Sequence, residues 1–171
     1  MRKSLFATVA VSGALAAAVI APGVATAADT VVTFTVAGGA LNITAPASQT
    51  LTVNGDQAAG SITPVVVSDQ RRGINGWTAS AISTAFTKPA PDPATIPATA
   101  VTYQGSLPAV TGVAVVTPSL LPVVLDTNKN VQVATAVIGA NTATWNGAVT
   151  VTLPSDVVAG VYTGTITHSV A

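Results

Sequence analysis

Apolar and polar residues alternate one by one along most of the chain. In the stretch from Val149 to Leu153, Val-Thr-Val-Thr-Leu, the apolar side chains would point to one face of a strand and the threonines to the other. A period of two is typical of half-buried β-strands. We expect strands of this kind at residues 31–36, 41–44, 62–68, 77–82, 113–117, 131–138, 149–153 and 161–170.

Turn-forming residues separate these segments, among them the pairs Asn54-Gly55 and Asn146-Gly147. Prolines at positions 89, 91, 93 and 97 predict an extended surface loop over residues 88–97 and argue against a central strand there. Short Val- and Thr-rich strands separated by such turns predict an all-β fold. We expect a single antiparallel β-sandwich of the Ig-like or Greek-key type, with a barrel as the related alternative and almost no helix.

The N-terminal residues predict export from the cell. Arg2 and Lys3 precede an apolar run over residues 5–20, and the small residues 25–27 follow it. This layout is typical of a secretory signal peptide, whereas the run is short for a membrane span. We expect a signal peptide at residues 1–27, cleavage after Ala27 and one β-sandwich domain over residues 28–171; a retained membrane anchor is the alternative.

Composition narrows the classes of partner. After the predicted cleavage, four lysines and arginines stand against six aspartates, a net charge of −2. Such a balance argues against nucleic acid and against an anionic membrane surface as partners. The sequence contains no cysteine, so disulfides and a lipid anchor on cysteine are excluded and folding must rest on apolar burial. We expect no membrane insertion once the signal peptide is removed.

The inventory of reactive side chains argues against an enzyme. The sequence has no cysteine, no glutamate, a single histidine at His168, scattered aspartates and no Gly-x-Ser-x-Gly turn. A histidine on an alternating strand is more often a packing or hydrogen-bonding group than a catalytic base. We therefore predict a non-enzymatic protein without a cofactor or metal; a secreted hydrolase is a remote alternative.

One stretch, Asp126-Thr127-Asn128-Lys129-Asn130, has the alternating oxygen ligands with which a calcium loop begins. A helix-loop-helix calcium site needs glycine at its sixth position and glutamate at its twelfth, and the chain has Val131 and Val137 there. Asn and Asp tolerate the left-handed conformations of tight turns. We predict a hairpin turn at residues 126–130.

The region from Asp69 to Ala79 resembles a known family. Asp69, Arg71 and the pair Gly76-Trp77 follow the pattern of an Asp-x-Arg turn, a Gly-Trp pair and a strand in the WxL-type cell-surface domains of Gram-positive bacteria. Residues 145–170 resemble the closing hairpin of that family. Each signature is altered, because Ala79 replaces the leucine of the first Trp-x-Leu and His168 begins the tripeptide at the place of the second.

The resemblance implies a β-rich module that is exported and held noncovalently on the cell wall, on peptidoglycan or another envelope glycan. The ligand-binding candidates are Asp69, Arg71, Trp77 and His168. For Trp77 we favour a buried strand anchor over an exposed platform for sugar rings, and for Asp69 with Arg71 a brace of the turn over contacts to a ligand. The alternative function is a structural or adhesive surface protein that self-assembles, or pairs with another surface protein, by β-strand addition.

Overall fold

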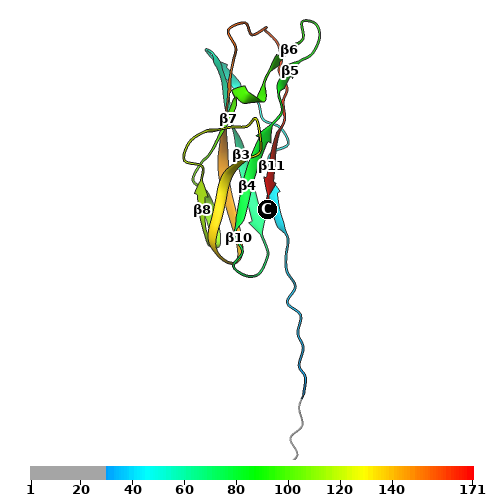
Figure 1. Cartoon of the computed structure of the whole chain (residues 1–171), viewed down its shortest axis with the longest axis vertical. Coiled ribbons are helices and arrows are strands. Elements are labelled where there is room, and N and C mark those ends of the chain that lie inside the picture. The colour runs from blue at the N-terminus through cyan, green and yellow to red at the C-terminus, as the bar shows by residue number, and fades with distance from the viewer. Residues whose placement is uncertain (1–29) are drawn as a thin grey trace, which may run out of the picture. The chain divides into compact units, whose positions relative to one another are not determined.

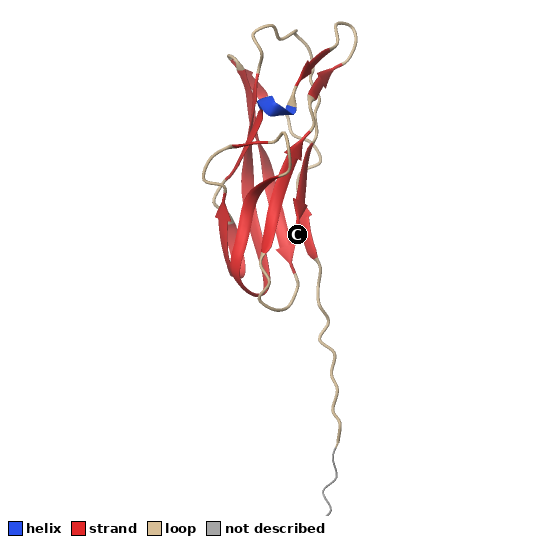
Figure 2. Ribbon diagram, viewed as in Figure 1, coloured by secondary structure: helices blue, strands red, loops and turns tan. Residues whose placement is uncertain are grey.

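Antiparallel strands make up nearly all the regular structure of the computed structural model, which describes residues 30–171. Residues 36–171 form one unit, built on a nine-stranded sheet, and the preceding residues are grouped separately from it. The all-β, antiparallel prediction is confirmed (Figure 2). The predicted signal peptide at residues 1–27 and its cleavage site after Ala27 lie outside the described residues.

Two long strands organise the sheet (Figure 1). Strand β3 (Gln57–Asp69) pairs with β10 (Lys129–Thr152) along nearly its whole length. On its other edge β3 pairs with β1 and β2, while β10 also pairs with β4, β7 and β8, β4 pairs with β11, and β7 pairs with β9. The bounds of these shorter strands are β1 Leu41–Thr44, β2 Thr52–Asn54, β4 Trp77–Ser83, β7 Val101–Gly105, β8 Ala109–Pro118, β9 Val123–Val124 and β11 Ile166–Val170.

Strands β8 and β10 bend together. Their pairing shifts register between Thr135 and Ile138 and again between Ile138 and Asn141. Gly112, Ala136 and Gly139 have positive φ angles at this bend, a conformation that suits glycine and is uncommon for alanine. Because each strand continues past the bend, one hydrogen-bonded sheet supplies both walls of the core.

The core consists of the inward-facing side chains of these strands. Its largest members are Trp77, Trp145, Tyr103 and Leu125, all nearly or fully buried, and valines of β3, β7 and β10 fill the space between them. Removal of this apolar surface from water is the main favourable term in folding, at roughly 25 cal/mol per Å² buried. With no cysteine in the sequence, this burial carries the stability that disulfides supply in many secreted domains.

Most of the predicted strands are present, but one of the predictions is wrong. Residues 31–36 alternate as a strand would, but no strand forms there. Strand β3 ends at Asp69, which lies opposite Leu41, and Gly39 and Ala40 already bond to Gln70 beyond that end. Residues upstream of Gly39 therefore have no residue of β3 opposite them.

Two further stretches differ from expectation. Of the strand predicted at residues 161–170 only β11 forms, and residues 161–165 have a single bridge, between Thr163 and Thr87. Within the loop predicted at residues 88–97 the ends pair as a small separate sheet of β5 (Phe86–Lys88) and β6 (Ala94–Ile96), with the prolines outside the strands. A 3-10 turn, η1 (Ala98–Ala100), leads into β7. No helix in residues 30–171 is long and apolar enough to cross a bilayer.

Candidate functional site

Asp69 and Arg71 form a closed turn at the end of β3. The Asp69 carboxylate accepts hydrogen bonds from the backbone N–H of Arg71 at 2.9 Å, from its Nε at 2.9 Å and from its Nη2 at 3.0 Å. Arg71 Nη2 also donates to the carbonyl oxygen of Gly76 at 3.0 Å. Asp69 is 1% exposed, and the hydrogen bonds from Arg71 lower its pKa below the usual value against the opposing effect of burial.

Trp77 belongs to the same cluster through Asn141 on β10. The indole Nε1 donates to Asn141 Oδ1 at 3.1 Å, and the Asn141 side-chain amide donates to the carbonyl oxygen of Gly139 at 3.3 Å. Trp77 is 2% exposed, so its ring offers no open face to a sugar. Gly76 is required before it, since a Cβ there would collide with the carbonyl oxygen of Ala134.

The structure therefore brings three predicted site residues into one region, where Asp69 and Arg71 bond to each other and Trp77 bonds to Asn141. Asp69 and Arg71 hold the turn between β3 and β4, and Trp77 anchors β4 in the core. This arrangement is the brace and strand anchor that the sequence analysis favoured for these residues. Arg71, with 31% of its side chain exposed, is the one member of the three that reaches solvent.

His168 lies apart from that cluster, in the middle of β11 opposite Ala81 of β4. Its Nε2 is 3.2 Å from the hydroxyl oxygen of Tyr103, and the two rings meet edge to face with centroids 5.4 Å apart. Trp145 Nε1 donates to the same hydroxyl at 3.0 Å. Because that oxygen accepts from Trp145, its own proton is free to be donated to Nε2 of a neutral His168.

The electrostatics support a neutral histidine. Burial lowers the pKa of His168, and burial raises the pKa of Tyr103 to about 12 against the opposing hydrogen bond from Trp145. Both shifts favour the uncharged forms, because a low-dielectric surrounding penalises charge. With the Tyr103 hydroxyl donating to Nε2, the neutral ring would carry its proton on Nδ1 and could donate a hydrogen bond from there.

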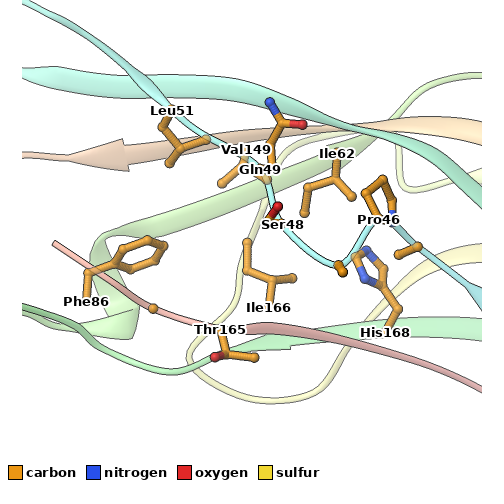
Figure 3. Close-up of a pocket in the computed structure, with 13 residues that line it drawn as sticks. Pro46, Ser48, Gln49, Leu51, Ile62, Phe86, Val149, Thr165, Ile166 and His168 are labelled. Carbon is orange, nitrogen blue, oxygen red and sulfur yellow. The ribbon is translucent and has the colours of Figure 1, made fainter. Parts of the chain in front are cut away.

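A surface pocket of about 170 Å³ opens beside His168. It lies between β11 with the residues just before it and the loop of residues 45–51, which joins β1 to β2. Figure 3 shows His168 beside Pro46 at one end and Phe86 at the other, with Ile166 between them. The polar residues of the lining are Ser48, Gln49, Thr165 and His168.

The pocket combines apolar walls with uncharged polar groups. None of the described residues that line it is acidic or basic at neutral pH. Its volume is below the roughly 300 Å³ at which sites for drug-sized ligands begin. It therefore suits one uncharged ring or substituent of a larger ligand, held by hydrogen bonds and apolar contact.

Residues 126–130 lead from β9 into β10, but the prediction of a hairpin turn there is wrong, because β9 pairs with β7 and not with β10. Asp126 pairs with Lys129 at 3.4 Å. Desolvation, the largest single effect, acts to raise the pKa of the exposed Asp126 carboxyl, but the hydrogen bonds and charge of Lys129 and the hydrogen bonds from Thr127 together lower it. Within residues 30–171 no three His, Cys, Asp or Glu side chains gather where they could hold one metal ion.

Known proteins add nothing to this geometry. Comparisons with models of protein families, with curated proteins and with solved structures each found no match. The resemblance to WxL domains therefore rests on the sequence pattern around Asp69 and Trp77 and in residues 145–170.

Sequence reasoning identified His168 but missed its surroundings. Tyr103 and Trp145 are buried in the core, and they also form the hydrogen-bonded chain that orients the imidazole. Nothing in the sequence of residues 45–51 indicated that this loop would line a pocket. Its position depends on pairing of β1 and β2 with two separate parts of β3, which no local pattern shows.

The lowered pKa of His168 predicts a pH dependence of stability. Above the ordinary histidine pKa of 6.5 both folded and unfolded chains hold a neutral ring. As the pH falls below that value the unfolded chain takes up a proton before the folded one, so His168 makes the free energy of unfolding decrease. Urea titrations from pH 7.5 to pH 5 should show this decrease in the wild type and a smaller one in His168→Gln. Equal pH dependence in the two proteins would contradict burial of a neutral ring.

Proposed function

We propose that the protein is a secreted binding module, associated noncovalently with the cell wall, whose pocket beside His168 takes an uncharged part of an envelope glycan such as peptidoglycan. The observation that carries the proposal is the pocket itself, which combines apolar walls with the imidazole of His168 and with Ser48 and Gln49 at its exposed rim. Acetamido and hydroxyl groups on a sugar ring match such a lining, since they need hydrogen-bond partners and no counter-charge.

Two features of the sequence support the envelope as the place of action. The first 27 residues have the layout of a signal peptide, and the turn from Asp69 to Trp77 resembles the WxL pattern. The low charge of the chain, 7% of residues, favours binding that persists in salt, because hydrogen bonds and apolar contacts are screened far less than exposed ion pairs.

Filling the pocket should weaken binding to soluble glycan at least tenfold. Ser48→Trp places a large ring at the rim, and Ser155→Trp makes the same change at an exposed position outside the pocket. Backbone amide shifts should be followed by NMR while oligosaccharides cut from peptidoglycan are added. We expect saturable shifts at residues 48–49 and 165–168 in the wild type and in Ser155→Trp, and at least a tenfold loss of affinity in Ser48→Trp.

Two results would count against this proposal. Shifts confined to another surface of the unit would place the ligand elsewhere, and equal affinity in Ser48→Trp would remove the pocket from binding. Release of smaller sugars or peptides during the titration would contradict a non-enzymatic module.

A further inference from the structure

The residues from Val31 to Val36 have the sequence of a strand and no strand partner within residues 30–171. Their side chains are open to solvent, with exposed fractions of 88% for Val31, 81% for Val32, 86% for Phe34 and 57% for Val36. Val32, Phe34 and Val36 would share one face of a strand, and Thr33 and Thr35 would lie on the other. We call residues 31–36 the arm.

Several strands of the unit pair with a single neighbour among the described residues, and the longest of them is β8, with ten residues. Within the described residues β8 pairs only with β10, so its other edge carries unpaired backbone N–H and C=O groups. Natural proteins protect such edges with charged side chains, prolines or bulges. The ten residues of β8, Ala-Val-Thr-Gly-Val-Ala-Val-Val-Thr-Pro, contain no charge and have proline only at the end. Val113 and Val115 are 53% and 57% exposed.

We propose that the arm of one copy of this protein pairs as an added strand with the open edge of β8 in a second copy. Both segments are uncharged and rich in valine and threonine, which is the composition that favours strand addition; the arm has no pairing partner among the described residues, and β8 has one open edge. Pairing would give hydrogen-bond partners to the unpaired backbone groups of the β8 edge and would remove Val32, Phe34 and Val36 from water. The threonines of the arm would face outward, as they do on the unit's own strands.

The link between the arm and β1 is too short for pairing with β8 of the same copy. Hydrogen bonds fix Gly39 and Ala40 to Gln70, which leaves Ala37 and Gly38 as the only free connection. Next to this connection, neighbouring strands of the sheet place four residues opposite one another in a row: Leu41 of β1, Asp69 of β3, Asn141 of β10 and Gly112 of β8. Measured along the sheet, a strand outside β8 would lie four strand spacings from β1, roughly 19 Å. The free connection spans roughly 10 Å when fully extended.

Charges on the apolar face of the arm should prevent association. Sedimentation velocity of the exported protein over a hundredfold concentration range should show growth from monomer to larger species. The double variant Val32→Lys with Phe34→Lys should remain monomeric, and Thr33→Lys with Thr35→Lys, with equal charge on the opposite face, should still associate. At a concentration low enough for all three proteins to be monomeric they should melt at the same temperature, because none of these side chains belongs to the core cluster.

The edge that receives the arm can be located with a spin label, since a chain without cysteine accepts one label at Thr35→Cys. Labelled protein mixed with ¹⁵N-labelled protein should broaden amide signals of residues 109–118 more than those of β11. A wild-type protein that stays monomeric at every concentration would overturn the proposal, as would association of the Val32→Lys, Phe34→Lys variant at wild-type strength. Broadening centred on any other strand would overturn the assignment to β8. None of these readouts depends on glycan binding.

Discussion

Replacement of Trp77 by alanine should lower the free energy of unfolding by about 3 to 5 kcal/mol, the range found when a buried aromatic side chain is removed from a core. The indole is 2% exposed and packs within the main core cluster. Its loss would leave a cavity at the start of β4 and would also remove the donor that bonds Asn141 on β10 at 3.1 Å. Urea unfolding of the wild type and the variant measures the difference.

The matched control is Ile74→Ala, three residues earlier. Ile74 is 78% exposed, so its truncation should change stability by less than about 0.5 kcal/mol. A loss below about 1 kcal/mol for Trp77→Ala would mean that the ring is open to solvent, and it would restore Trp77 as a platform for stacking on sugars.

Replacement of Asp69 by alanine should lower the free energy of unfolding by about 2 to 3 kcal/mol. The carboxylate is buried and accepts three hydrogen bonds from Arg71, and hydrogen bonds to charged groups contribute about 1.5 to 3 kcal/mol. Arg71 keeps contact with water, which limits the cost of leaving its guanidinium without a partner. Chemical denaturation at pH 7 measures the change.

The same carboxylate predicts a dependence on acid. Hydrogen bonds from Arg71 lower the pKa of Asp69, so its contribution is complete above the unfolded value of 3.8 and is lost as the pH falls below that value. Asp69→Asn should therefore reduce the fall in stability between pH 4 and pH 2. Asp126→Asn is the control, because Asp126 forms an exposed pair with Lys129 and should matter little. If the fall in stability between pH 4 and pH 2 were the same in Asp69→Asn and in Asp126→Asn, the Asp69 carboxylate would have no special role in the acid dependence.

Much of the fold could be predicted from local pattern. Alternation fixes which residues of a strand face the core, and it correctly predicted β1, β4 and the inner part of β3. It failed at residues 31–36, because alternation shows that a segment could pair as a strand but does not show whether a partner strand extends far enough to lie beside it. It also missed β7, although Tyr103 in that strand is fully buried, since a short segment after several prolines gives a weak periodic signal.

The candidate site was predictable only in part. Asp69 and Arg71 are two residues apart, so their pairing follows from sequence distance, and the structure confirms it. His168 is 65 residues from Tyr103, which orients it, and lies far in sequence from the loop that lines its pocket. Such neighbours are set by strand order and register, which depend on the whole sheet.

Co-sedimentation of the exported protein with purified cell-wall sacculi tests the proposed function most directly. We predict that the protein pellets with sacculi in a saturable manner, stays bound in high salt, and is released intact by denaturant without solubilising sugars or peptides. Ser155→Trp should behave like the wild type, and Ser48→Trp should remain in the supernatant. Wild-type protein that stays in the supernatant at every concentration of sacculi would contradict wall binding.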